Sequence, residues 1–346
     1  MGKRALVLAG GGAKGSFQVG MLEELVCNRG LDFEILRGVS VGALNASFLA
    51  QAPLDPNPAK SLANLQAQVV ALKDLWTRDI TGDHSVYADR SGFAGMVAGA
   101  DSLYSLEPLR RLVKQRILPG KLKKSGRDFA VGTVSLVSGE YQEWSPGQPD
   151  FIERIIASAS IPVVFPFVTI GKDVLVDGGA RNVTPLSSAF EAGPDEIYVL
   201  LTSRLVKVGG VFPTCGVQPT TFDQWDDNWL GTHVNGIDVL KRTVEILTDE
   251  IYLDDIRGAL EWNEVVGRVN AVAAAAKSPG VQPAVATAVA ALVNSVSKRE
   301  VKISVLAPQE WYGAKNDATD FDPAKIRWAI QHGAGIAADP KRWLWP

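Results

Sequence analysis

The sequence is poor in cysteine and histidine, which narrows the chemistry open to it. Only two cysteines, Cys27 and Cys215, occur in 346 residues. They are too few for a disulfide framework and are typical of a protein from a reducing compartment. The cysteines and the three histidines form no cluster with the spacing of a zinc site. The sequence therefore predicts neither a disulfide-stabilised fold nor a bound metal.

Long hydrophobic runs and an excess of one charge are also missing. No stretch reaches the roughly 18 consecutive apolar residues that suggest a transmembrane helix, and the run before the first glycines is too short for a signal-peptide core. A formal net charge of −3 gives no electrostatic case for nucleic-acid binding. We therefore expect a cytoplasmic protein, in which any peripheral membrane contact would come from apolar surface.

What is present is an alternation of strand-like and helix-like segments. This predicts an α/β fold, with a mainly parallel sheet and helices on both faces. No linker divides the chain, so we expect a core over residues 1–205 and, over 206–346, an insertion and a mainly helical C-terminal extension that completes the same domain. The Ala/Val-rich stretch Val272 to Val293 is interrupted by Lys277 to Gly280 and predicts two short core helices. Strands are expected near 4–9, 35–39, 128–137, 139–144, 167–176, 196–202 and 301–307.

Ser40 is the central residue of the pentapeptide Gly38 to Gly42. It follows the apolar run Ile35 to Val39 and precedes the helix-favouring Ala43 to Ala50. A strand that turns at once into a helix strains the central residue, and side chains at the flanking glycines would collide. Alone, the pentapeptide would also fit a helix start capped by Ser40. The strand before it and the helix after it favour a nucleophile elbow.

A glycine-rich loop, Gly10, Gly11, Gly12, Ala13, Lys14 and Gly15, joins the first predicted strand to a helix. Its amide N–H groups form a nest for negative charge. The spacing matches the dinucleotide fingerprint, with Glu34 about where a ribose-binding acid is expected. A P-loop would need Ser or Thr after Lys14, where Gly15 stands. An oxyanion hole would explain an elbow serine one βα unit later, which the dinucleotide interpretation does not.

A third motif, Asp177, Gly178 and Gly179, ends the short apolar strand Val174 to Val176. A carboxylate at the C-terminal end of a strand in an α/β sheet lies where ligands bind, and the glycines let a substrate approach closely. An ordinary Asp-Gly turn would contain the same residues. Taken alone, the motif leaves both interpretations open.

In this order, the three motifs resemble those of the patatin-like phospholipases, which carry a Gly-Gly-Gly-x-Lys/Arg-Gly loop, a G-x-S-x-G serine and an Asp-Gly-Gly aspartate. The small-residue segment Ala157 to Pro166 also looks like the family's stretch before that aspartate. The resemblance covers about residues 4–202. It implies a patatin-like three-layer sandwich, a lipid ester substrate and no cofactor. It also implies a Ser40–Asp177 dyad, an oxyanion hole built from the Gly10 to Gly15 loop, and supporting roles for Gly38, Gly42, Gly178 and Gly179.

Two further stretches are candidates for the border of the site. Residues 77–104 mix glycines with large apolar residues, which suits a lid over an acyl-binding cleft or a loop packed on the core. Residues 208–233 carry aromatic side chains among aspartates. These aromatics would line the cleft or anchor an insertion.

The order of the motifs bears on the mechanism. An α/β-hydrolase triad runs Ser, Asp or Glu, then His, and only His233 and His332 follow Asp177. Such enzymes usually reach their elbow after several strands, whereas Ser40 follows the second. The dyad implied by the resemblance needs a carboxylate base whose pKa rises from about 3.9 to about 7, which takes roughly 4 kcal/mol and a partly desolvated site.

The sequence thus predicts a cofactor-independent serine acyl hydrolase of lipid carboxyl esters, of phospholipase A or lysophospholipase type. Two alternatives stay open. One is an NAD(P)-binding oxidoreductase that uses the glycine loop, and the other is a non-catalytic lipid-binding protein.

Overall fold

The computed structural model of the protein describes residues 2–90, 95, 99–204, 236–278, 282–295, 300–310, 312 and 317–344. Its centre is a mixed sheet in the order β10-β9-β1-β2-β5-β8-β7, and β6 also pairs with β5. The strands of this sheet are β1 (Arg4–Leu8), β2 (Ile35–Val39), β5 (Asp128–Ser135), β6 (Tyr141–Trp144), β7 (Val168–Ile170), β8 (Asp173–Asp177), β9 (Glu196–Leu200) and β10 (Lys302–Leu306). A separate two-stranded sheet joins β3 (Ala88–Asp89) to β4 (Tyr104–Ser105).

Both faces of the sheet are buried, as the apolar strands predict. The strands from β10 to β5 are parallel. In β1, Leu6 and Leu8 join one hydrophobic cluster while Ala5 and Val7 join another, because successive side chains of a strand point to opposite faces. The sheet is therefore the middle of three layers.

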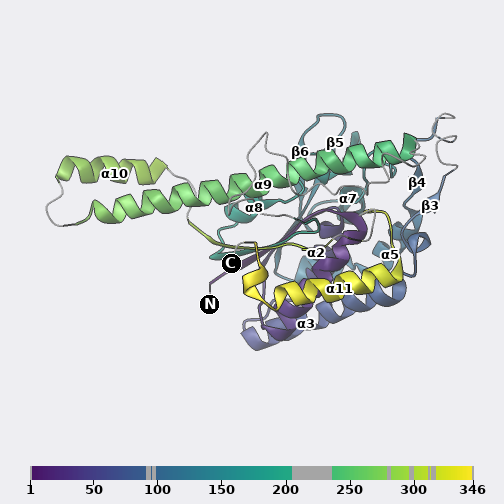
Figure 1. Ribbon diagram of the computed structural model, residues 1–346, viewed down its shortest axis with the longest axis horizontal. Helices are drawn as coiled ribbons and strands as arrows, with labels where there is room; N and C mark the ends of the chain where they lie inside the picture. The colour runs from purple at the N-terminus through teal and green to yellow at the C-terminus, as the bar shows by residue number, and fades with distance from the viewer. Residues whose placement is uncertain are drawn as a thin grey trace.

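Helices form the two outer layers (Figure 1). Helices α8 (Leu186–Glu191) and α9 (Gly236–Ala275) contribute to the cluster around Ala5 and Val7. The other helices that pack on the sheet contribute to the cluster around Leu6 and Leu8. They are α1 (Gly15–Leu22), α2 (Val41–Leu49), α3 (Pro58–Asp74), α5 (Glu107–Arg116), α6 (Pro119–Lys124), α7 (Phe151–Ser158) and α11 (Pro323–Ala337). The predicted α/β fold with helices on both faces is confirmed.

Two strand ends meet on one edge of β5. Strand β2 pairs in parallel with Asp128 to Gly132, and β8 pairs antiparallel with Thr133 to Ser135. Strand β6 pairs with residues 131–134 and so occupies the opposite edge. Val39, the last residue of β2, lies opposite Gly132, and Asp177, the last residue of β8, lies opposite Thr133. The two strands therefore run toward each other along β5, and their ends meet head-on.

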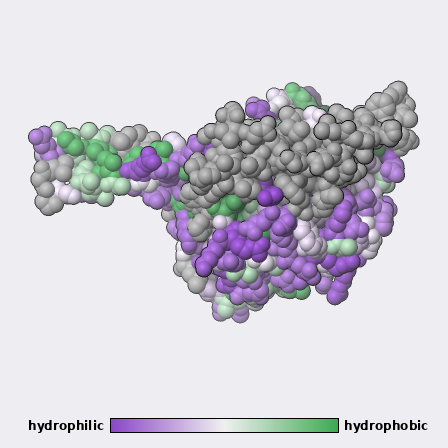
Figure 2. Space-filling view, in the orientation of Figure 1, coloured by the Kyte–Doolittle hydropathy of each residue, from purple (hydrophilic) through white to green (hydrophobic). Residues whose placement is uncertain are grey.

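The C-terminal part of the chain extends both the sheet and its helical layer. Strand β10 pairs with β9, and α11 packs closely against α1. The prediction of two short core helices over Val272 to Val293 is wrong, because this stretch does not lie in the core. Val272 lies near the end of the long helix α9, and α10 (Pro283–Ser295) forms with it a hairpin that projects from the body (Figure 1). Val272 and Val285 are about half exposed, and apolar residues show on the surface of this hairpin (Figure 2).

Candidate active site

Ser40 stands at a sharp turn between β2 and α2. Its backbone has φ 57° and ψ −129°, a left-handed conformation that costs a non-glycine residue about 1–3 kcal/mol. The neighbouring glycines make this turn possible, because a Cβ at Gly42 would collide with the carbonyl of Leu8 and one at Gly38 would collide with the backbone of Gly42. The N–H of Ser40 donates to Ser158 Oγ at 3.0 Å. The local geometry is that of a nucleophile elbow.

Asp177 faces this elbow from the end of β8. Its side chain is 3% exposed, and its Oδ1 accepts the N–H of Gly179 at 2.7 Å. Burial raises the pKa of the Asp177 carboxyl from 3.8 to about 7, and the nearby Ser40 hydroxyl and the hydrogen bond from the Gly179 N–H oppose this rise. A carboxyl with a pKa near neutrality is suited to accept a proton and release it again.

The contact between Ser40 and Asp177 is present but loose. The Ser40 hydroxyl lies close enough to Asp177 to lower its pKa, yet Oδ2 of Asp177 has no partner with full hydrogen-bond geometry among the described residues. Catalytic hydrogen bonds are often long or poorly aligned until substrate binds. Among the described residues, Oδ2 is thus the buried oxygen of this carboxyl that accepts no hydrogen bond.

The glycine loop lies beside Ser40. A Cβ at Gly10 would be 3.2 Å from the Ser40 Cβ, which is tighter than an ordinary contact, so the loop packs closely against Ser40. The next two residues have left-handed backbone, with φ of 145° at Gly11 and 56° at Gly12. No described residue accepts a hydrogen bond from the N–H of Gly11 or Gly12. These two amides beside Ser40 are therefore available to an external acceptor, as an oxyanion hole requires.

The rest of the predicted oxyanion loop is engaged elsewhere. The N–H of Gly10 donates to Val183 O, that of Ala13 to Ala318 O and that of Lys14 to Gly11 O. The N–H of Gly15 donates within the 3-10 turn that opens α1. The Lys14 side chain is buried and donates to Ser203 Oγ at 3.1 Å, so it braces the loop. The geometry thus narrows the predicted set of donors to Gly11 and Gly12.

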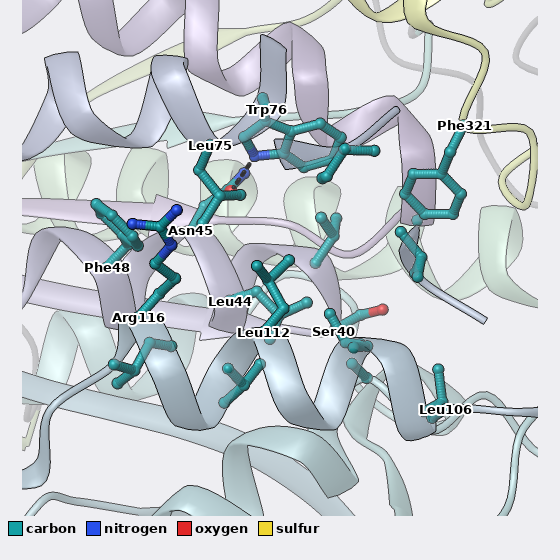
Figure 3. Close-up of a pocket in the computed structure, with 18 of the residues that line it drawn as sticks. Ser40, Leu44, Asn45, Phe48, Leu75, Trp76, Leu106, Leu112, Arg116 and Phe321 are labelled. Atoms are coloured by element: carbon teal, nitrogen blue, oxygen red, sulfur yellow. Dashed lines mark hydrogen bonds between the residues drawn. The ribbon is translucent and has the colours of Figure 1, made fainter. Parts of the chain in front are cut away.

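A largely apolar pocket opens at Ser40 and runs between α2, α3 and α5. Figure 3 shows Ser40, Leu106 and Phe321 at one end, Leu44 and Leu112 between, and Phe48 and Arg116 at the other. Asn45 is a polar lining residue, but it binds Trp76 Nε1 at 3.0 Å, and Arg116 is paired with Asp79 at 2.5 Å. From the predicted lid 77–104, Ile80 and Val86 line this pocket and are buried. Its other apolar lining residues include Val41, Leu72, Leu75, Leu109, Val113, Ile117, Ile161 and Phe165.

Glu34, His84 and His332, which the competing interpretations would use, have their hydrogen-bond partners elsewhere than at Ser40 and Asp177. Glu34 binds the N–H of Arg4 at 2.8 Å, at the N-terminal ends of β1 and β2, whereas the glycine loop follows the C-terminal end of β1. A ribose-binding acid would have to stand at the same end as the loop. His84 bonds to Thr81, and His332 accepts the N–H of Gln309. Residues 208–233, which include Cys215 and His233, lie outside the described residues.

No group of three or more His, Cys, Asp or Glu side chains suited to a metal occurs among the described residues. None of the described helices combines the length and the apolar character that a bilayer span requires.

The chain matches a known protein family over its N-terminal part. The patatin-like phospholipase family matches residues 6–190, which is more than half of the chain. The chain belongs to this family.

The patatin-like segment includes Ser40, Asp177 and the glycine loop, and membership implies a lipid acyl hydrolase. Among solved structures, the chain is similar to VipD from Legionella pneumophila, with 17% identity over 60% of this chain and 51% of that chain and a TM-score of 0.33. It thus spans about half the length of VipD. The ExoU–SpcU complex from the type III secretion system of Pseudomonas aeruginosa matches with 16% identity over 97% of this chain and 74% of that chain, at a TM-score of 0.29. The comparison with curated proteins found no match.

Sequence reasoning missed two residues that support the patatin-like site. Ser158, at the end of α7, holds the N–H of Ser40, and Asp255 on α9 holds the N–H groups of Val183 and Thr184. Ser158 belongs to the small-residue segment Ala157 to Pro166 that carries part of the family resemblance. Its hydrogen bond to the Ser40 N–H could not be predicted from that segment. Nothing local to Asp255 distinguishes it from other acidic residues on a long helix.

Proposed function

We propose that the protein hydrolyses carboxyl esters of lipids, in the manner of a phospholipase A or lysophospholipase, with Ser40 as nucleophile and Asp177 as general base. The observation that carries the proposal is the juxtaposition of a strained elbow serine with a desolvated carboxyl at the end of an apolar pocket. The pocket fits an acyl chain, whereas a nucleotide would need polar lining.

In the proposed reaction, Ser40 Oγ attacks the ester carbonyl carbon while Asp177 Oδ2 takes the hydroxyl proton. The negative charge that develops on the carbonyl oxygen is held by the N–H groups of Gly11 and Gly12. The alcohol leaves with the proton from Asp177. Water then attacks the acyl-enzyme, with Asp177 again as base, and Ser40 is regenerated as the fatty acid departs.

The proposal is tested by labelling the full-length protein with a serine-directed fluorophosphonate and by assaying a panel of lipid esters that includes phosphatidylcholine, lysophosphatidylcholine and triacylglycerol. We expect one labelled serine, Ser40, and turnover of at least one phospholipid. Lipid binding without labelling or turnover would instead indicate a non-catalytic lipid-binding protein. Binding of NAD(P) at micromolar concentration would favour the NAD(P)-binding oxidoreductase.

Substituting either oxyanion glycine should lower turnover by about a hundredfold or more. A Cβ at Gly11 would collide with the Thr202 side chain and one at Gly12 with the carbonyl of Ala318, so Gly11→Ala or Gly12→Ala displaces the amides. The ester KM should change little, because the amides act on the charge that forms in the transition state. Steady-state kinetics on a phospholipid separates these effects.

The control for this experiment is Gly193→Ala. Gly193 also has positive φ, 67°, but a Cβ there would meet nothing within 4 Å. It therefore reports the backbone strain of the substitution alone. Equal losses in Gly193→Ala and Gly12→Ala would argue against an oxyanion role.

Acyl-chain length should strongly affect kcat/KM. Each CH₂ buried in the pocket contributes roughly 0.8 kcal/mol, which is about fourfold in kcat/KM per methylene. Long-chain esters in micelles should therefore be turned over faster than short soluble esters. A series of esters that differ only in chain length measures this slope.

Leu112→Trp should flatten this dependence, because Leu112 lies midway along the pocket and a larger ring would block chains beyond it (Figure 3). The matched control is Leu118→Trp, at an exposed leucine that does not line the pocket. A wild-type preference for short, water-soluble esters would contradict both the acyl pocket and the lipid substrate.

A further inference from the structure

Helix α9 lies outside the segment that the family matches, yet it reaches the loop that follows Asp177. Asp255 Oδ2 accepts two backbone hydrogen bonds, from Val183 N–H at 3.0 Å and Thr184 N–H at 2.9 Å. The neighbouring Ile256 and Leu260 are buried in the cluster beneath the sheet, so this part of α9 is fixed against the core. Burial raises the pKa of the Asp255 carboxyl to about 7, against the opposing effect of the two N–H donors.

Val183 connects this carboxyl to the glycine loop. Its carbonyl accepts the N–H of Gly10 at 3.1 Å, and Thr202 Oγ1 donates to the carbonyl of the same glycine. A Cβ at Gly10 would be 3.2 Å from the Ser40 Cβ and 3.4 Å from Val183 Cγ1, so the three residues are in close contact. The position of Gly10, and of the two amides that follow it, is thus set in part by Val183.

We propose that Asp255 is a positioning residue, which holds the Val183–Thr184 segment and, through Val183, the Gly10–Gly12 loop in the arrangement that hydrolysis needs. The effect of Asp255 on kcat rests on the proposed function. The two hydrogen bonds that Val183 and Thr184 donate to Asp255, here called the clamp, do not depend on it. Helix α9 would then take part in the active site, because without Asp255 two backbone N–H groups of the loop after Asp177 would lose their acceptor. A shift of about 1 Å in such a loop is enough to lower kcat by about a hundredfold.

Four variants of the full chain test the clamp. Asp255→Asn keeps an oxygen in the same place, Asp255→Glu keeps the charge but moves it by one methylene, and Asp255→Ala removes the acceptor. Asp254→Ala is the matched control, because Asp254 is the preceding residue on α9 and its side chain is 62% exposed in an ion pair with Arg257.

The first measurement is hydrogen exchange resolved to the peptides that contain Gly10 and Val183. Exchange there should accelerate by about tenfold or more in Asp255→Ala and Asp255→Glu, and should stay at the wild-type rate in Asp255→Asn and Asp254→Ala. This readout needs no activity. If the wild type fails to label at Ser40, the proposed function fails while the exchange data still decide the clamp.

The second measurement is kinetic. In Asp255→Glu and Asp255→Ala, kcat and the rate of fluorophosphonate labelling should fall by about tenfold or more, with little change in KM, and Asp255→Asn should restore both. If Asp255→Ala does not fold, the comparison of Asp255→Asn with Asp255→Glu carries the test. Folded Asp255→Glu with wild-type kcat and wild-type exchange at Gly10 would overturn the proposal.

Discussion

Ser40→Ala is expected to abolish fluorophosphonate labelling and to lower ester turnover by about four orders of magnitude or more, because alanine offers no oxygen to attack the carbonyl. Folding should survive, since one buried hydroxyl contributes only about 1 kcal/mol. The turn itself is held by the hydrogen bond from the Ser40 N–H to Ser158 Oγ, which alanine retains. Turnover on the preferred lipid ester, with circular dichroism of the same samples, measures both outcomes.

The control is Ser47→Ala, on the helix α2 that follows Ser40. Ser47 is fully buried and its hydroxyl donates to the carbonyl of Ala43 at 2.5 Å, so the variant also loses one buried hydroxyl. It should keep wild-type labelling and turnover. Wild-type turnover in Ser40→Ala would remove Ser40 from the mechanism, whatever the control shows.

The elbow could be predicted from the sequence because its determinants are local. Five residues and the strand and helix around them fix the backbone of Ser40, and the structure shows the positive φ that the flanking glycines predict. Local sequence determines the glycine loop only in part. Its conformation follows from three consecutive glycines, but which amides stay open depends on Val183 and Ala318, far along the chain.

The sequence predicted that Asp177 ends a strand, but it did not predict the hairpin that brings this strand end to Ser40. The sequence suggested one strand over 167–176, whereas the chain turns at Gly171, with φ 64°, and forms the hairpin of β7 and β8. Strand β8 therefore runs antiparallel to β5, and Asp177 meets the end of β2 head-on. The Gly171–Lys172 turn signal was present, but the apolar residues on either side of it concealed the reversal.

A glycine late in a helical segment is typical of a helix end. Helix α11 nevertheless runs past Gly333 to Ala337. A Cβ at Gly333 would collide with the carbonyl of Phe17, and one at Gly20 with the carbonyl of Ile330. These glycines allow α1 and α11 to approach closely, and no pattern within either helix alone reveals such a contact.

Asp177→Asn is expected to lower turnover by about a thousandfold or more, because it keeps the shape of the side chain and removes the base. The hydrogen bond from Gly179 N–H can persist, since an amide oxygen still accepts it. Asp173→Asn, at the other end of β8, is the control for loss of an acidic side chain on this strand. Steady-state kinetics of the two variants beside the wild type gives the comparison.

The pH dependence of the wild type should reflect the same group. Because burial raises the pKa of Asp177 to about 7, kcat/KM should rise with pH up to about 7 and level off above it. The residual activity of Asp177→Asn should lack this step. A wild-type profile that is flat from pH 5 to pH 8 would contradict Asp177 as the base.

As the pH rises, the stability of the folded protein should fall while its activity rises. The folded protein keeps a proton on Asp177 that the unfolded chain releases above the reference value of 3.8, so the contribution of Asp177 to stability is full below about pH 4 and is lost as pH rises to about 7. Asparagine carries no buried charge. At pH 8, Asp177→Asn should therefore be more stable than the wild type by up to about 4 kcal/mol. Urea unfolding at pH 5 and pH 8 measures the difference.

The histidines complete the test of the dyad against a triad. Replacing His84, His233 and His332 together with glutamine should leave most activity, because in the proposed mechanism Asp177 takes the proton directly. His332 packs edge-on against Phe17 and stacks on Trp328, so its replacement is expected to lower stability more than turnover. Activity that survives Asp177→Asn but collapses in the histidine variant would mean that a histidine is the base and Asp177 only orients it.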